Sequence, residues 1–527
     1  MKKKKANLIE GESDVVRLVA AIDIGATSVR MLIAGIDEGS GDIRRIDSLH
    51  QAVDLGRDAF TRGYIRKETT ERCVEILRSF QEIMAEYRIT EAKDIKAVAT
   101  SAVREAVNRE AFLDRLYIAT GIDVEDIDEA EVTRYVYLAV KPVLDVTPGL
   151  SRGTVLLTEV GGGSTEFLVI RRGQVVFAHT YRLGAVRIRE LLDDVNAPVA
   201  RIPDILENEI HNSIERIQHS VSLRSKPKML AVGGDIRFAA QRIMRGWDGS
   251  GVAEIKLSDL DKLCRKILAM SQDEIVRKFG LTYQEAETLG PALLSYARLA
   301  GAMRLEKISV ASTSLRDGLV VDLASDAWSN EFSAQVLQSA RKLAKQYDED
   351  IEHAEHVTRL ALQLFRALKD EHRLHERYEL ILRVAGLLHD IGTFISAGGH
   401  HKHSMYLIQN SEIFGLGARE RNLIAQVAQY HRRSEPKQTH PDYMALDRES
   451  RIAVAKLSAI LRVADALDRS HACNVGAMKV LLEPGQVSLV VPDERDLTIE
   501  ELGLQQKGQM FERVYGLRII MVPGDVI

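Results

Sequence analysis

The sequence is poor in cysteine, with only Cys73, Cys264 and Cys473 in 527 residues. They lie far apart and form no Cys-X-X-Cys pair, which excludes a disulfide framework or a zinc knuckle and fits a reducing compartment. Long hydrophobic runs are also missing, since stretches such as VVRLVAAIDIGA are too short and too charged to cross a membrane. The basic start is not followed by an apolar segment, so we expect no signal peptide and a cytoplasmic protein without a membrane partner.

The chain also lacks an excess of positive charge. Its formal net charge is -5, which argues against a protein that binds DNA or an anionic membrane surface. Local charge can still bind a small polyanion. The hydrophobic content of 45% and the charged content of 28% are ordinary for a globular protein, and the length predicts three or four domains of ~150 residues each.

Two similar β-turn-β segments, about 136 residues apart, dominate the first part of the chain. The first reads AIDIGATSVRMLI and the second reads EVGGGSTEFLV, each with a glycine turn between apolar runs. The repetition predicts a duplicated fold of two α/β lobes. Helical periodicity then continues after Ala324, and strand-like text returns at the end. The predicted domains are a disordered tail at 1–18, lobe I at 19–135, lobe II at 136–324, a helical domain at 325–474 and a small α/β segment at 475–527.

The glycine turns have the composition of phosphate-binding loops. Successive N–H groups in such a turn form an anion-binding nest, and Thr and Ser hydroxyls add hydrogen-bond donors. Each turn follows a carboxylate at the end of a strand, Asp23 or Glu159, and hard cations such as Mg²⁺ bind carboxylate oxygens. Two turns of this kind, facing each other, would hold a phosphate chain from both sides.

Seven segments together resemble the exopolyphosphatase / guanosine pentaphosphate phosphohydrolase (Ppx/GppA) family. Besides the two turns they are VDLG at 53–56, ATSAVREAVN at 99–108, YRLGAVRI at 181–188, AVGGD at 231–235 and SLRDGLV at 314–320. The resemblance implies two actin-like ATPase (ribonuclease H-like) lobes, and it implies Mg²⁺-dependent hydrolysis of the terminal phosphate of inorganic polyphosphate or pppGpp by a water molecule. It also suggests a homodimer.

The resemblance assigns roles to residues of both turns and of the segment at 99–108. The implied phosphate-binding residues are Asp23, Gly25, Ala26, Thr27, Ser28, Arg104, Gly161, Gly162, Gly163, Ser164 and Thr165. The implied metal-side carboxylates are Asp23, Glu159 and Glu166.

Three positions depart from the family pattern. Glu159 stands where the second turn usually begins with Asp, and Asp235 stands where a small hydroxyl residue is usual. Val132 occupies the position of the water-activating Glu, and Val cannot accept a proton. Glu131 and Glu129 are the nearest carboxylates, and they are the candidate catalytic bases, with a narrow preference for Glu131. The alternative is that both are ordinary carboxylates of the first helical turn, where the helix dipole favours them.

A second constellation lies in the helical part. His353, the pair His389-Asp390 and Asp465 follow the H…HD…D order of HD phosphohydrolases, with His403 and His431 as additional ligands. Imidazole and carboxylate groups suit a divalent transition metal or Mg²⁺, and such an ion would generate a hydroxide nucleophile from bound water. His389 and Asp390 can converge on one metal only if their helix ends there. His400 and His401, taken alone, are better read as surface residues.

The sequence therefore supports three functions. The leading prediction is an exopolyphosphatase-type hydrolase, a phosphoanhydride hydrolase that acts in the cleft between the lobes. The second is an HD-type metal-dependent phosphohydrolase whose lobes sense phosphate or an alarmone. The third is a regulator that binds polyphosphate or (p)ppGpp without turnover.

Overall fold

The computed structural model describes residues 16–194, 226–324, 330–476, 478–491 and 496–524, together with 207, 208, 210, 211, 214 and 215. Most of the predicted tail therefore lies outside the described residues. The chain divides into two compact units, residues 1–329 and 330–527, close to the boundary predicted after Ala324. They are called unit 1 and unit 2 below, and each is described by itself.

The first sheet of unit 1 has the strand order β3-β2-β1-β4-β5. β1 and β2 form a hairpin around the first glycine turn, and β1 runs parallel to β4, which runs parallel to β5. The strands are rich in Val, Ile and Ala and are buried on both faces in the middle of the sheet, as expected for parallel strands. Their bounds are β1 (Val16–Ile24), β2 (Ser28–Asp37), β3 (Ile43–Ala52), β4 (Ile95–Ala99) and β5 (Val124–Asp126).

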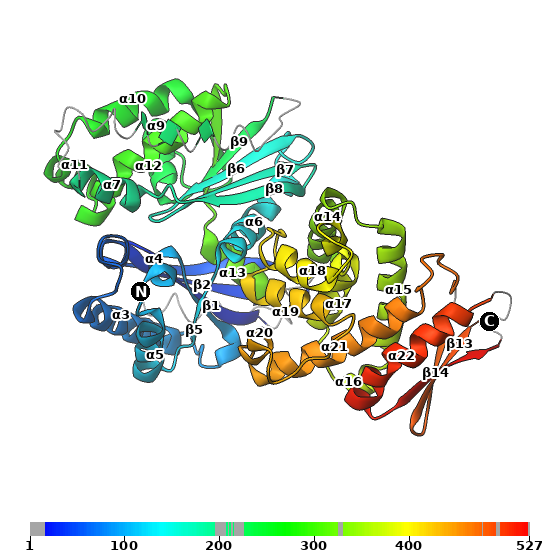
Figure 1. The fold of residues 1–527 in the computed structure, drawn as a ribbon. Coiled ribbons are helices and arrows are strands. Elements are labelled where there is room, and N and C mark those ends of the chain that lie inside the picture. The colour runs from blue at the N-terminus through cyan, green and yellow to red at the C-terminus, as the bar shows by residue number, and fades with distance from the viewer. Residues whose placement is uncertain are drawn as a thin grey trace. The chain divides into compact units, whose positions relative to one another are not determined.

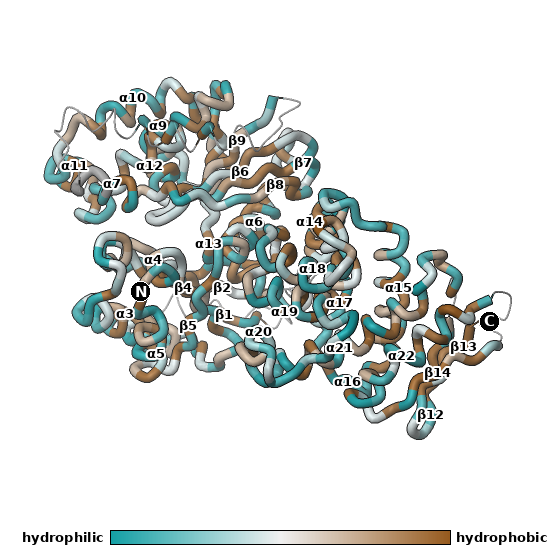
Figure 2. The backbone as a smooth tube through the Cα atoms, in the orientation of Figure 1, coloured by the Kyte–Doolittle hydropathy of each residue, from teal (hydrophilic) through white to brown (hydrophobic). Residues whose placement is uncertain are grey.

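The second sheet repeats the first with one additional strand, in the order β10-β11-β9-β6-β7-β8. The strands β6, β7, β8, β9 and β11 take the places of β1 to β5. Figure 2 shows apolar residues concentrated along these strands. The bounds are β6 (Thr154–Val160), β7 (Thr165–Arg171), β8 (Gln174–Tyr181), β9 (Lys228–Val232), β10 (Val252–Lys256) and β11 (Lys307–Ala311).

Helices pack against both sheets (Figure 1). α6 and α13 pack on each other, and α13 also lies against β1. The buried Arg134 of α6 pairs with Asp322 of α13 at 3.5 Å, and Gly318 of α13 leaves no space for a side chain against the Tyr135 carbonyl. The helices of unit 1 are α2 (Leu55–Arg57), η1 (Asp58–Arg62), α3 (Lys67–Glu86), η2 (Ala92–Asp94), α4 (Ser101–Glu105), α5 (Arg109–Thr120), α6 (Glu129–Val146), α7 (Ala185–Asp194), α9 (Gly234–Ile243), α10 (Leu257–Leu268), α11 (Gln272–Phe279), α12 (Tyr283–Ala302) and α13 (Leu315–Ala324).

The predicted lobe boundary at residues 135 and 136 falls inside α6. The two sheets nevertheless repeat one topology, so the predicted class of two actin-like α/β lobes followed by a helical domain and a small α/β segment is confirmed. The precise domain limits stay a prediction.

Unit 2 is helical up to residue 466 and ends in a small sheet. Apolar faces at helical spacing bury a common core, for example Leu360, Leu364, Val384 and Leu388. The helices are α14 (Asn330–Gln346), α15 (Ile351–Ala367), α16 (Lys369–His372), α17 (Arg377–Leu388), η4 (Ile391–Phe394), α18 (His400–Gln409), α19 (Ala418–Gln429), α20 (Pro441–Met444) and α21 (Arg448–Ala466).

The sheet of unit 2 has the order β12-β13-β14, and α22 packs against both β14 and α21. These elements are β12 (Lys479–Glu483), β13 (Gln486–Val491), α22 (Thr498–Tyr515) and β14 (Arg518–Pro523). Across the described ranges, no helix has the length and apolarity that a membrane crossing requires.

Candidate active site

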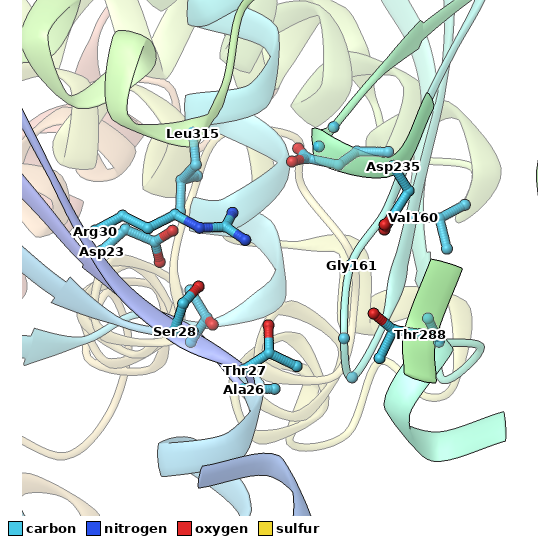
Figure 3. Close-up of a pocket in the computed structure, with 18 of the residues that line it drawn as sticks. Asp23, Ala26, Thr27, Ser28, Arg30, Val160, Gly161, Asp235, Thr288 and Leu315 are labelled. Carbon is cyan, nitrogen blue, oxygen red and sulfur yellow. The ribbon is translucent and has the colours of Figure 1, made fainter. Parts of the chain in front are cut away.

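A polar cavity of about 440 Å³ lies in unit 1 where β1 and β6 end. Its wall includes both glycine turns, the start of α9 and the first turn of α6. Figure 3 shows Asp23, Thr27 and Ser28 on one side of this space and Asp235, Val160 and Gly161 on the other. The duplication therefore brings two copies of one turn to a single cavity.

The two turns are built alike. The Gly25 N–H donates to the Ser28 carbonyl at 2.9 Å, and the Gly161 N–H donates to the Ser164 carbonyl at 2.8 Å. The remaining main-chain N–H groups of these turns, those of Ala26, Thr27, Gly162 and Gly163, have no acceptor among the described residues. Unused N–H groups that border a cavity are what binding of an anion requires.

The turns touch each other through Ala26 and Gly162. A Cβ atom added to Gly162 would lie only 2.8 Å from the Ala26 Cβ and 3.2 Å from a methyl group of Val186. Thr165 is the one predicted phosphate ligand that does not line the cavity. Its side chain is buried, and its hydroxyl donates to the Leu183 carbonyl, because alternation along β7 directs Glu166 rather than Thr165 toward the cavity.

Three carboxylates predicted to lie beside a metal border the cavity. Asp23 is 8% exposed, and Glu159 and Glu166 are cross-strand neighbours on β6 and β7. Ser164 donates to Glu166 at 2.6 Å, whereas the side-chain carboxylates of Asp23 and Glu159 form no hydrogen bond or ion pair within the described part of the chain. Partnerless carboxylate oxygens facing one space are a donor set that suits a hard divalent cation.

Burial raises the pKa of all three carboxyl groups. Desolvation is the main cause, and for Glu159 the neighbouring Glu166 and Asp23 add to it. Asp235 also lines the cavity, and burial raises its pKa to about 6. A bound cation would reverse these shifts, since it favours the ionised carboxylates.

Four arginines border the same cavity: Arg30, Arg104, Arg237 and Arg316. Arg30 pairs in register with Asp23 across β1 and β2, so its guanidinium reaches into the cavity beside that carboxylate (Figure 3). Sequence reasoning did not single out Arg30 or Arg316 as site residues. The sequence feature that could have indicated Arg30 is its position opposite Asp23 across the first turn. Arg316 had no such feature, because its location depends on how α13 packs. Guanidinium groups bind phosphate oxygens in a fixed fork geometry.

The two candidate bases have different positions. Glu131 forms a capping box with Asp128, in which its carboxylate accepts the Asp128 N–H at 3.0 Å, and it does not line the cavity. Glu129, at the first position of α6, does line the cavity, and it lies 3.6 Å from Arg104. Val132 also contributes to the cavity wall. The structure therefore favours Glu129 over Glu131, contrary to the preference drawn from the sequence.

The histidines and aspartates predicted to bind metal gather in unit 2. α17 ends at Leu388, as convergence of His389 and Asp390 requires, and His353, His389 and Asp390 lie close enough to hold one ion. Asp465 lies 3.8 Å from His353, and His431 lies 3.3 Å from Asp390. His403 does not join these clusters among the described residues.

His400, rather than His403, completes the histidine cluster. It is 4% exposed, and its Nε2 atom lies 3.1 Å from Asp390 Oδ1, so the expectation of a surface residue was wrong. His400 is the first residue of α18 and its ring reaches Asp390, whereas His403, three residues later, is partly buried and joins no cluster among the described residues. Burial lowers the pKa of His389 to about 4, which keeps its imidazole neutral, as a metal ligand must be.

The fold and the cavity define a class of protein, namely two-lobed actin-like proteins in which paired glycine turns border one polar cavity. The chain belongs to the Ppx/GppA phosphatase family, whose phosphatase region matches residues 32–327 and whose domain III matches residues 337–500.

Relatives cover most of the chain. The chain is 25% identical over 448 residues to a protein of Photobacterium profundum named guanosine-5'-triphosphate,3'-diphosphate pyrophosphatase. The aligned region covers 85% of this chain and 86% of the relative. A protein of the same name from Aeromonas salmonicida is 24% identical over 502 residues, or 93% and 97% of the two chains. A crystal structure of an exopolyphosphatase from Cytophaga hutchinsonii matches the fold with a TM-score of 0.52 and 20% identity, over 58% of this chain and 98% of that one.

Proposed function

We propose that this phosphatase hydrolyses the terminal phosphoanhydride bond of a phosphate chain, in pppGpp or inorganic polyphosphate, inside the cavity of unit 1. The observation that carries the proposal is the pair of glycine turns that meet at Ala26 and Gly162 with unused N–H groups. The relatives named guanosine-5'-triphosphate,3'-diphosphate pyrophosphatase support a guanosine polyphosphate as one substrate.

Different groups of the cavity would bind the phosphate chain and the cation. The turn N–H groups and the hydroxyls of Thr27, Ser28 and Ser164 would bind phosphate oxygens, and the cavity arginines would neutralise the rest of the chain. Asp23, Glu159 and Glu166 would hold Mg²⁺, which when bound offsets phosphate charge. The cavity acts chiefly by positioning and electrostatic stabilisation, as in other phosphoryl transfers.

Glu129 is the proposed general base. It would accept a proton from the water that attacks the terminal phosphorus, while the bond to the bridging oxygen breaks and the rest of the chain leaves. Its position on the cavity, near both Arg104 and Glu166, supports this role.

Phosphate release from pppGpp and from polyphosphate, with Mg²⁺ and after its removal by EDTA, tests the proposal. Glu129→Gln should lower kcat by ~10²–10⁴-fold, the usual contribution of a general base. Glu131→Gln is the matched control, since Gln can still accept the Asp128 N–H, and it should stay within a few fold of wild type. Tight binding of either compound without release would instead indicate a regulator.

A second candidate function belongs to unit 2. We infer that its histidine–aspartate cluster binds a divalent transition metal and cleaves a phosphoester. The observation that favours it is that the Nε2 atoms of His353 and His389 are buried and have no hydrogen-bond partner among the residues that the structure describes. If phosphate-ester hydrolysis persists in Glu129→Gln and is lost in His389→Ala, this second site carries activity; the reverse pattern would reject it.

A further inference from the structure

The Tyr296 hydroxyl lies where two strands of lobe II end beside the cavity. Tyr296 belongs to α12, and its side chain is fully buried in the core of that lobe. The hydroxyl accepts the Val160 N–H at 2.8 Å and donates to the Val232 carbonyl at 2.5 Å. Val160 is the last residue of β6, and Val232 is the last residue of β9. One side-chain oxygen therefore joins the ends of two neighbouring strands.

This contact interrupts the ladder between β6 and β9. The two strands pair in parallel, with Glu159 opposite Val232 at the last pair. Paired parallel strands ordinarily bond to each other directly, from N–H to carbonyl. Here the tyrosine oxygen lies between the last N–H of β6 and the last carbonyl of β9, so it separates the two strand ends.

Both strands lead directly into turns that border the cavity. The second glycine turn, Gly161–Gly163, follows β6, and Gly233 and Gly234 follow β9. All five glycines line the cavity. A Cβ atom added to Gly233 would lie only 3.0 Å from the Tyr296 hydroxyl, and the φ of +122° at Gly233 also favours glycine. The hydroxyl thus contacts the start of one turn and is bonded to the residue that precedes the other.

The same hydroxyl lies close to the cavity carboxylates. Glu159 directly precedes Val160 and lines the cavity. Burial raises the pKa of Tyr296 far above its ordinary value, and the charges of Glu159, Asp235 and Glu166 raise it further. The hydroxyl therefore keeps its proton and remains a donor to the main chain at neutral pH.

We propose that Tyr296 is a positioning residue for the phosphate site, because its hydroxyl sets the spacing between the second glycine turn and the turn that follows β9. That spacing fixes the unused N–H groups of Gly162 and Gly163 and the carboxylate of Glu159. Tyr296 does not itself line the cavity, so it acts through the main chain of the two strands. The inference rests on the phosphate binding proposed above for unit 1.

The competing explanation is that the hydroxyl only satisfies its own hydrogen bonds in the core and contributes stability. Tyr296→Phe separates the two explanations, because phenylalanine fills the same space and removes only the oxygen. The buried Val160 N–H and Val232 carbonyl then lose their partner, and they regain one only by moving toward each other. The turns that follow them move as well.

Tyr137→Phe is the matched control in the same unit. Tyr137 of α6 is 2% exposed, and its hydroxyl donates to the Gly173 carbonyl at 2.7 Å. It does not line the cavity. Both substitutions therefore remove a buried hydroxyl that is bonded to the main chain, but only one of these hydroxyls joins the strands that lead into the turns.

Binding of methylenediphosphonate in the presence of Mg²⁺ is the first readout, because this probe has two phosphonate groups and no bond that the enzyme hydrolyses. Calorimetric titration gives the dissociation constant and the stoichiometry separately. A purely structural role lowers the stoichiometry, since fewer chains are folded, and leaves the dissociation constant unchanged. In Tyr296→Phe the dissociation constant should rise ~10-fold, about the effect of one lost hydrogen bond, and in Tyr137→Phe it should stay within twofold. Binding contributed by unit 2 is the same in all three proteins.

Phosphate release from pppGpp and from polyphosphate is the second readout. The kcat/KM of Tyr296→Phe should fall by ~10-fold or more, whereas Tyr137→Phe should stay within twofold of wild type. Equal dissociation constants for the diphosphonate in wild type and Tyr296→Phe overturn the proposal, and so do equal effects of the two substitutions.

The outcomes separate this proposal from the one on which it rests. A wild-type chain that binds the diphosphonate and releases no phosphate from either substrate rejects the hydrolysis, while the dissociation constants still decide the role of Tyr296. A wild-type chain that does not bind the diphosphonate overturns the positioning role as well, since there is then no phosphate site for the hydroxyl to arrange.

Discussion

Gly162→Ala tests whether the contact between the two turns matters for catalysis. The backbone of Gly162 is not in the left-handed region, so alanine adds no conformational strain there, and its effect is purely steric. The new methyl carbon would lie 2.8 Å from the Ala26 Cβ, whereas carbon atoms pack best at about 3.5–4.0 Å. The two turns must therefore separate by roughly 0.7–1.2 Å to admit it.

The expected magnitude follows from this displacement. An added methyl group in a packed contact costs about 1–3 kcal/mol. If that cost falls on the arrangement that binds the transition state, kcat/KM decreases by about 5–150-fold, at 1.4 kcal/mol for each tenfold change. The hydrophobic cores of the two lobes are largely separate and do not depend on the contact between the turns. The midpoint of thermal unfolding should therefore change much less than kcat/KM.

The assay is initial-rate phosphate release on both substrates, with thermal unfolding measured in parallel. Gly301→Ala is the control, because Gly301 is the penultimate residue of α12 in the same unit and an added Cβ there would meet open space. It should leave kcat/KM within twofold. A Gly162→Ala enzyme with wild-type kcat/KM would refute the idea that the turns must approach this closely.

Three further predictions concern unit 2 and the thiols. Burial raises the pKa of Glu349 to about 9, so between pH ~4.5 and ~9 the folded chain holds a proton that the unfolded chain releases. In metal-stripped protein the retained proton lowers the free energy of unfolding by up to about 1.4 kcal/mol per pH unit as pH rises. Glu349→Gln should flatten the plot of unfolding free energy against pH; equal slopes in wild type and variant would contradict the raised pKa. Lys507→Met leaves buried Asp465 unpaired and should cost about 3–5 kcal/mol of unfolding free energy in EDTA, partly restored by Mn²⁺; an unchanged denaturation midpoint would count against the pairing. A thiol reagent at pH 8 should label Cys473 alone in the native chain, because Cys73 and Cys264 are buried, which raises the pKa of both thiols to about 12, whereas Cys473 is partly exposed, although burial and Asp468 raise its pKa too; a second fast-reacting thiol would argue against the burial of Cys73 and Cys264.

The sequence by itself determined the two-lobed architecture and the position of the two glycine turns. The turns could be found because their chemistry is local: a carboxylate, a glycine and hydroxyl residues follow one another within eight positions, between apolar strands. Their repetition 136 residues apart predicted the duplicated sheets, since similar sequences in the same order adopt the same topology.

The tertiary structure decided which side chains share a space. Glu131 and Glu129 are two residues apart, yet the capping box engages one while the other reaches the cavity, and periodicity alone cannot distinguish them. His400 and His403 lie within one turn of α18, and only the packing of that turn beside Asp390 and His431 shows which ring joins the cluster. The contact of Ala26 with Gly162 and that of Lys507 with Asp465 join segments far apart in the chain, so they arise only when the folded elements pack together.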